Sequence, residues 1–231
     1  MMFLALFIGF LVWKKIGKEK EFNSTQVLEF YIWVIIGLFI GNRIFHLLVY
    51  NFNYFISDPL GALSSTNGFA SHGGIIGGTL AAYFFCKKEK LPFWKWADLA
   101  IVPIALVAGF VRIGNFLNGE IVGKVTAVPW AVNFPKFEGL RHPVQLYEAA
   151  KNFLIFGILY GIKGLNLPRG FIYWSFIFLF SFLRFFIEFF KEYLVFSSGL
   201  DIGQWISLVL ITISGPLLYL IYTKKIRLEE N

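Results

Sequence analysis

Long apolar stretches separated by short polar connections dominate this chain. Seven can be distinguished, and most approach the roughly 20 residues that a helix needs to cross a hydrocarbon layer of about 30 Å. They lie at about 1–13, 28–50, 68–86, 97–111, 145–162, 171–190 and 203–222. The pattern predicts an all-α polytopic integral membrane protein with about seven transmembrane helices. The sequence shows no internal repeat or soluble segment, so we expect residues 1–231 to form a single transmembrane domain.

The first apolar stretch is shorter than the others. Its thirteen residues would cover only about 20 Å as a helix, and Lys14 and Lys15 follow it directly. No basic region precedes it and no small-residue cleavage pattern follows it, so it does not resemble a signal peptide. We expect it to be the inner part of a first helix whose outer end is missing or supplied differently.

Composition supports the membrane assignment. Hydrophobic residues make up 57% of the chain and charged residues only 15%, with 29 Phe. A water-soluble domain of this length does not need so much apolar surface.

Basic residues predict the orientation, because cytoplasmic connections carry an excess of Lys and Arg. They cluster in alternate connections: Lys14, Lys15, Lys18, Lys20; Lys87, Lys88, Lys90, Lys95; Lys163, Arg169; and Lys224, Lys225, Arg227. We therefore expect the C-terminus in the cytoplasm and the N-terminus outside. The connections 51–67, 112–144 and 191–202 then face outward, and 112–144 forms a small head region. The net charge of +7 suits anionic lipid headgroups, and no motif indicates nucleic acid.

Cysteine and histidine usage excludes two kinds of site. Cys86 is the single cysteine, so no internal disulfide can form, and a structural role suits it better than a nucleophilic one. His46, His72 and His142 are widely spaced and show no metal-ligand pattern, so we expect no metal.

The densest polar cluster runs from Arg112 to Glu120, with the sequence Arg-Ile-Gly-Asn-Phe-Leu-Asn-Gly-Glu. It places an arginine, a carboxylate, and the carboxamides of Asn115 and Asn118 directly after an apolar stretch. A charge at the membrane edge is usually paired, faces a cavity, or has a function. An arginine snorkelling to the headgroups is the alternative. The density of polar groups favours an active site.

A histidine opens the third apolar stretch from the outer side, in His72-Gly-Gly-Ile-Ile-Gly-Gly78. An imidazole at a wet helix start can act as a base or a hydrogen-bond donor, although a simple interfacial cap explains it equally well. Gly73 and Gly77, like Gly74 and Gly78, are four residues apart, a spacing that lets membrane helices approach closely. We predict that these glycines form a packing face.

Two further polar groups lie at outward helix ends. Arg141-His142-Pro-Val-Gln-Leu-Tyr147-Glu148 opens the fifth stretch, where Glu148 could merely favour the helix N-terminus and Tyr147 could anchor the interface. Arg184 and Glu188 are four residues apart on one helix face. They form either a self-neutralised pair or an arginine that is oriented by a carboxylate to hold a phosphate bidentately. Arg112 and Arg184 on one side would make an anion site of headgroup size.

Together these motifs resemble the bacterial prolipoprotein diacylglyceryl transferase family. The resemblance covers about residues 37–222, and its most specific element runs from Arg112 to Gly123. Four other motifs follow the family's order and approximate spacing: Ser71-His72-Gly-Gly, His142-Pro-Val-Gln-Leu-Tyr-Glu148, Arg184-Phe-Phe-Ile-Glu188-Phe and Gly203-Gln204-Trp-Ile-Ser-Leu.

The resemblance implies an enzyme of the bacterial inner membrane. It would move the diacylglyceryl group of phosphatidylglycerol to the lipobox cysteine of a prolipoprotein signal peptide, form a thioether and release glycerol phosphate. It implies no cofactor and no metal. The catalytic positions would be His72, Arg112, Glu120 and Arg184. The substrate-binding positions would be Arg43, Asn115, Asn118, Gly123, His142, Tyr147 and Glu188.

The chain also departs from the family's usual pattern. Members commonly begin with an extra stretch carrying Tyr-Gly, which has no counterpart before Met1. Val111 replaces a common glycine, and Lys191-Glu192 replaces Arg-Gln-Pro-like or Arg-Glu-Pro-like residues. His72 is our first expectation for the thiol base, Glu120 the second, and activation by the arginine field the third. The alternative function is a non-catalytic phosphatidylglycerol-binding membrane paralogue.

Overall fold

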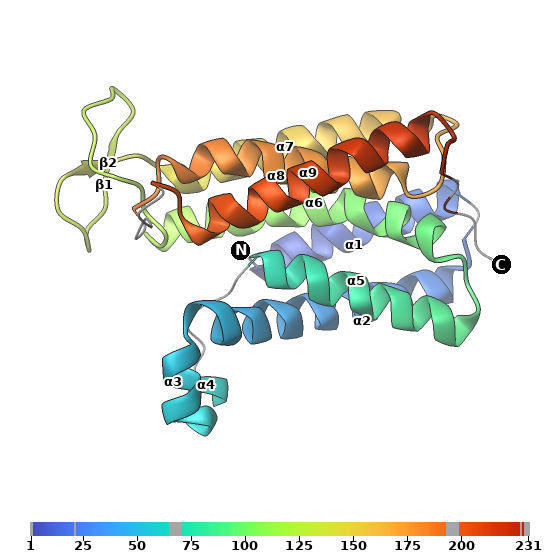
Figure 1. Ribbon diagram of the computed structural model, residues 1–231, viewed down its shortest axis with the longest axis horizontal. Helices are drawn as coiled ribbons and strands as arrows, with labels where there is room; N and C mark the ends of the chain where they lie inside the picture. Colours follow the sequence, from blue (N-terminus) through green and yellow to red (C-terminus); the bar gives the residue numbers. More distant parts are fainter. Residues whose placement is uncertain (1, 21, 65–70, 193–198, 227, 229–231) are drawn as a thin grey trace. The chain divides into compact units, whose positions relative to one another are not determined.

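The computed structural model describes residues 2–20, 22–64, 71–192, 199–226 and 228. They form helices joined by short connections, and a small two-stranded sheet precedes α7 (Figure 1). The helices are α1 Met2–Glu19, α2 Ser24–Phe45, a π-helix His46–Tyr50, α3 Phe52–Ser57, α4 Pro59–Ser64, α5 Ser71–Glu89, α6 Phe93–Leu117, α7 Val144–Ile162, α8 Phe171–Glu188 and α9 Ile202–Tyr222. The strands are β1 Val132–Asn133 and β2 Leu140–Arg141.

Each predicted apolar stretch corresponds to a long helix, namely α1, α2 with the π-helix, α5, α6, α7, α8 and α9. Among the described residues, four helical segments are long and apolar enough to cross a membrane: Ser24–Tyr50, Phe93–Leu117, Phe171–Glu188 and Ile202–Tyr222. The prediction of a helical membrane protein is thus confirmed, whereas the number of seven spans stays a prediction.

Two predicted boundaries were wrong, and one predicted connection contains short helices. α1 continues through its lysines to Glu19, so its 18 residues reach about 27 Å rather than about 20 Å. α6 ends at Leu117, so Arg112 and Asn115 are helical and the connection to α7 begins later than predicted. The described part of 51–67 contains α3 and α4. Polar side chains at a membrane edge can stay in water while the backbone remains helical, which explains both errors.

The chain divides into two compact units. One contains residues Lys14–Ala97, and the other contains Met1–Trp13 and Asp98–Glu229. The expectation of a single transmembrane domain stays a prediction, and each unit is described separately.

In the first unit, α2 and α5 lie side by side (Figure 1). Glycines form the interface: a Cβ on Gly77 would lie 2.2 Å from the carbonyl oxygen of Gly37, and one on Gly73 would lie 2.3 Å from that of Gly41. The backbones therefore touch, which any larger residue would prevent. The predicted glycine packing face is confirmed, and its partners are Gly37 and Gly41.

In the second unit, α8 pairs with α9 and packs against α7 (Figure 1). Asp98 of α6 holds the beginning of α8, because its carboxylate accepts hydrogen bonds from the backbone N–H groups of Gly170 (2.7 Å) and Tyr173 (2.8 Å). These are among the N–H groups that a helix leaves without an intrahelical acceptor. Asp98 thus supplies from another helix the cap that the α8 sequence lacks.

Candidate active site

Two charged residues of α8 form the first part of the site. Arg184 Nη2 lies 2.5 Å from Glu188 Oε1, and both side chains are buried. The predicted pairing of residues four apart on one helix face is therefore present. The carboxylate holds the guanidinium from one side and defines its orientation.

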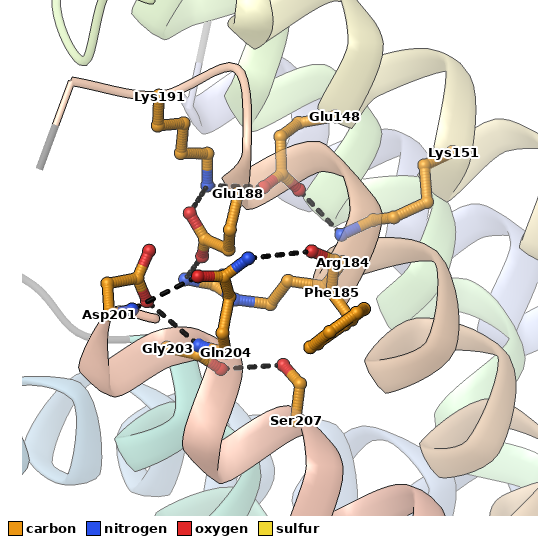
Figure 2. A network of polar contacts seen from close by, with 10 residues as sticks. All are labelled: Glu148, Lys151, Arg184, Phe185, Glu188, Lys191, Asp201, Gly203, Gln204 and Ser207. Atoms are coloured by element: carbon orange, nitrogen blue, oxygen red, sulfur yellow. Dashed lines mark hydrogen bonds and ion pairs between the residues drawn. The ribbon is translucent and has the colours of Figure 1, made fainter. Parts of the chain in front are cut away.

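A second carboxylate, Glu148 of α7, binds two lysines. Its Oε2 lies 2.5 Å from Lys151 Nζ and its Oε1 lies 2.6 Å from Lys191 Nζ. Lys191 also lies 3.0 Å from Glu188 Oε2, so it joins the carboxylates of α7 and α8. The ion pairs form one continuous chain, shown in Figure 2: Lys151, Glu148, Lys191, Glu188, Arg184.

The last turns of α6 and the N-cap residue of α9 add charges to this cluster. Arg112 lies within electrostatic range of Glu148, as Arg184 does. Asp201 lies within electrostatic range of both Glu188 and Arg184. We name as the charge cluster the residues Arg112, Lys151, Arg184, Lys191, Glu148, Glu188 and Asp201. Its four basic and three acidic groups leave one formal positive charge in excess, which suits a monoanion such as a phosphodiester.

Arg112 differs from the rest of the charge cluster. It is half-buried, and among the described residues its guanidinium forms no hydrogen bond or ion pair. An arginine carries five N–H donors in a fixed fork and stays charged. Arg112 is therefore available to an external anion.

Burial shifts the pKa values of Lys191 and Asp201, which lie between α8 and the body of α9. It lowers the pKa of the Lys191 ammonium, and the Glu148 carboxylate opposes that shift. Burial also raises the pKa of Asp201. The Glu188 charge adds to this rise, and hydrogen bonds from the backbone N–H groups of α9 oppose it. Both shifts reflect removal of a charged group from water.

The beginning of α9 covers the charge cluster through a capping box. The Asp201 carboxylate accepts from the Gln204 backbone N–H at 2.8 Å, and the Gln204 side chain accepts from the Asp201 backbone N–H at 3.0 Å (Figure 2). A Cβ on Gly203 would lie 2.9 Å from Glu188 Oε1. The Gly203-Gln204 motif thus leaves room for Glu188 and fixes the helix start beside it.

The predicted signature residues meet around Glu120. Its carboxylate accepts from Asn115 Nδ2 at 2.9 Å and from Asn118 Nδ2 at 3.2 Å. Its carbonyl oxygen accepts from Gln145 Nε2 at 2.6 Å, which attaches the end of α6 to the start of α7. Gln145 Oε1 is buried and has no hydrogen-bond partner among the described residues. Gln145 shares the helix face of Glu148, three residues away.

Gly123 lies in a backbone ladder rather than among the charged side chains. It pairs with Lys191, and its N–H donates to the His142 carbonyl oxygen at 3.1 Å. Arg141 supports the ladder: it donates to the Gly123 carbonyl oxygen at 3.1 Å and forms an ion pair with Glu192. The structure thus assigns Gly123 a backbone contact, and substrate binding by it stays a prediction.

His142 and Tyr147 form a separate aromatic group with Trp130 and Phe190. The Tyr147 hydroxyl accepts from Trp130 Nε1 at 2.6 Å and lies 3.2 Å from His142 Nδ1. The His142 and Phe190 ring centroids are 5.1 Å apart. Trp130 remains 59% exposed at the surface of the α6–α7 connection, whose sequence had not indicated this contact.

His72 and Arg43 belong to the unit formed by Lys14–Ala97. His72 is buried in the first turn of α5, with its ring centroid 6.4 Å from that of Phe45. The Arg43 guanidinium donates to the Ala62 carbonyl oxygen and so joins α2 to α4. Their roles at the active site stay predictions.

Two members of the charge cluster, Lys151 and Lys191, were not among the predicted site residues. Lys151 lies three residues after Glu148, and Lys191 lies three residues after Glu188. Both therefore follow a motif glutamate at helical spacing, which is the signal that could have identified them.

Comparison with known proteins identifies the family of this chain. Residues 1–221 match the family model for prolipoprotein diacylglyceryl transferase. The chain is similar to proteins named phosphatidylglycerol–prolipoprotein diacylglyceryl transferase from three bacteria. It is 34% identical to that of Tolumonas auensis over 94% of this chain and 87% of that protein. It is 35% identical to that of Geobacter sulfurreducens over 83% of this chain and 76% of that protein. It is 40% identical to that of Sinorhizobium medicae over 74% of this chain and 63% of that protein. This chain belongs to the prolipoprotein diacylglyceryl transferase family.

Proposed function

We propose that this protein transfers the diacylglyceryl group of phosphatidylglycerol to the lipobox cysteine of prolipoprotein signal peptides. Family membership supports the reaction, and one structural observation supports the lipid substrate. The charge cluster has one excess positive charge, and its member Arg112 has no hydrogen-bond partner among the described residues. A phosphatidylglycerol phosphodiester carries one negative charge and matches this excess.

In the proposed step, the cysteine sulfur attacks the glyceryl carbon that bears the phosphate ester. A carbon–sulfur bond forms, the carbon–oxygen bond to phosphate breaks, and glycerol phosphate leaves with the bonding electron pair. Arg112 and Arg184 stabilise the negative charge that grows on the phosphate, an effect that is often the largest in catalysis. The thiol proton passes to a base, because the thiolate is the reactive nucleophile.

Two side chains are candidates for that base. His72 is our first choice, because an imidazole titrates near neutral pH. Glu120 is the second, and Asn115 and Asn118 orient its carboxylate. The positive field of the arginines also favours the thiolate and is the third explanation.

The headgroup glycerol requires hydrogen-bonding groups of its own. Gln145 Oε1 is a buried acceptor without a partner among the described residues. It lies on the Glu148 face of α7. We assign Gln145 Oε1 as the acceptor of a hydrogen bond from a hydroxyl of the headgroup glycerol. The phosphate would lie at Arg112 and Arg184.

The proposed membrane arrangement has seven spanning helices, an outward N-terminus and a cytoplasmic C-terminus in the bacterial inner membrane. The lysine clusters at alternate connections support it. In this arrangement the α6–α7 connection and the charge cluster lie at the outer side. Protease added to spheroplasts that contain the protein with a C-terminal tag would test the orientation. A tag in the cytoplasm is protected from digestion.

A transfer assay tests the proposed activity. The purified protein is mixed with phosphatidylglycerol and a lipobox peptide, and mass spectrometry detects the thioether product. A peptide with serine in place of the cysteine is the control. We expect diacylglyceryl transfer to the cysteine peptide alone, with equimolar release of glycerol phosphate. Lipid binding without transfer would contradict the proposal and identify the non-catalytic binding protein instead.

A further inference from the structure

Lys151 is an unusual residue for the interior of a helix in a membrane protein. It is buried, and its Nζ lies 2.5 Å from Glu148 Oε2 and 3.9 Å from the centroid of the Phe180 ring. A carboxylate and an aromatic face therefore hold the ammonium on two sides. A buried ammonium is costly unless it is paired, so its partner explains how it is tolerated but not what it does.

Glu148 is already paired without Lys151. Lys191 binds its other oxygen at 2.6 Å, and Lys191 is held by Glu188 as well. A single lysine would suffice to neutralise the carboxylate. The second lysine occupies Oε2, the oxygen that Lys191 does not bind.

Of the two arginines within electrostatic range of Glu148, Arg184 is paired with Glu188, so a vacant Oε2 would attract Arg112. It lies within electrostatic range of Glu148 and forms no hydrogen bond or ion pair with another described residue. A charge-assisted pair between arginine and carboxylate is strong and frequently bidentate. Without Lys151, Glu148 would compete with the substrate phosphate for the Arg112 guanidinium.

We propose that Lys151 is a positioning residue that keeps Arg112 available to the phosphate by occupying Glu148 Oε2. The inference deepens the proposed function, on which it rests for the identity of the anion. Lys151 acts through Glu148 and needs no contact with the lipid. Its effect should therefore appear in anion affinity.

Lys151→Met tests the proposal, because it removes the ammonium and keeps most of the stem. We expect KM for phosphatidylglycerol in mixed micelles to rise about tenfold, corresponding to about 1.4 kcal/mol, with a smaller change in kcat. Inhibition by glycerol phosphate should weaken by a similar factor. Lys163→Met is the matched control: its ammonium lies 4.4 Å from the Tyr160 ring centroid at the C-cap of the same helix. It should leave KM unchanged.

The double variant Lys151→Met/Glu148→Gln separates positioning from a structural role. Without the competing carboxylate, Arg112 should be available again, and KM should return to within about threefold of the wild-type value (about 0.65 kcal/mol). A structural role predicts instead that any rise in KM of Lys151→Met, and any recovery in the double variant, follows the change in unfolding temperature. If Lys151→Met does not fold, the double variant still decides the question, because it removes both members of the buried pair. An unchanged KM in Lys151→Met, or a KM about tenfold raised in the double variant, overturns the proposal.

Binding of glycerol phosphate, measured by calorimetry, distinguishes failure of the proposed function from failure of the Lys151 positioning role. A wild-type protein that binds glycerol phosphate but transfers nothing contradicts the proposed function, while the Lys151 comparison still proceeds on anion affinity. An active wild type with equal anion affinity in Lys151→Met contradicts the positioning role alone. A wild type that neither transfers nor binds glycerol phosphate contradicts both.

Discussion

Gly123 lies directly against the backbone of His142. Its N–H donates to the His142 carbonyl oxygen at 3.1 Å, and a Cβ at this position would lie 2.6 Å from the same oxygen. On its other side, the Phe190 carbonyl oxygen would be 2.7 Å away. The segment after α6, the start of α7 and the end of α8 therefore meet at a residue that has no room for a side chain.

Gly123→Ala should destabilise the protein and strongly reduce transfer. The neighbouring atoms are backbone oxygens that cannot rotate away, so the ladder must shift, at a cost of about 1–3 kcal/mol. Lys191 pairs with Gly123, so the shift should reach the charge cluster. Thermal unfolding in detergent and the transfer assay measure both effects. Gly157→Ala is the control, since a Cβ there meets nothing within 4 Å. Equal behaviour of the two variants would contradict the packing argument.

Arg112→Ala and Arg184→Ala should each reduce kcat/KM for phosphatidylglycerol by at least about 100-fold, because each removes a preorganised cation from the leaving phosphate. Lysine at either position should restore little activity, since an ammonium lacks the planar fork of donors. Steady-state transfer kinetics test both statements. Normal turnover in folded alanine variants would refute the phosphate role.

Asn115 should act through Glu120, whose carboxylate accepts its Nδ2 hydrogen bond at 2.9 Å. Asn115→Ala should lower kcat, whereas the same change in a Glu120→Gln background should have a much smaller effect. The coupling energy expected for residues in direct contact is about 0.5–3 kcal/mol. A double-mutant cycle on kcat measures it. Additive effects would show that Asn115 contributes independently, for example by contacting the lipid.

His72 should produce the acidic limb of the pH–rate profile if it accepts the thiol proton. The neutral imidazole is the active base, so kcat/KM should fall as the pH decreases and the ring becomes protonated. His72→Gln should lose this limb but retain phosphatidylglycerol binding. Profiles of kcat/KM for both proteins test the assignment. A variant that keeps the limb would shift the role to Glu120 or to the arginine field.

Asp98→Ala should destabilise α8 without touching the charge cluster. Two part-buried backbone N–H groups, of Gly170 and Tyr173, lose their acceptor, and each buried donor without a partner costs about 1–3 kcal/mol. Thermal unfolding measures the loss. Asp58→Ala is a milder control, because Asp58 caps the exposed N–H of Gly61, which water can satisfy. Equal losses at the two sites would contradict the interhelical capping role.

Local patterns were sufficient to predict several features of this protein. Continuous apolar stretches predicted the long helices, because a membrane span needs about 20 apolar residues wherever it occurs. The spacing of Gly73 and Gly77 predicted a close helix contact. Arg184 and Glu188 were expected to pair, because residues four apart share a helix face. In each case the information lies within a single segment.

Helix ends and partners in other segments depended on the tertiary structure. Arg112 and Asn115 proved to be helical, because polar groups at a membrane edge do not stop a helix. The two lysines on Glu148 come from different segments, and the acceptor for the start of α8 is Asp98 on α6. The sequence itself determined the long apolar helices and the glycine packing face. Only the tertiary structure decided which charges neutralise one another, since Coulomb attraction depends on distance in space and not on separation along the chain.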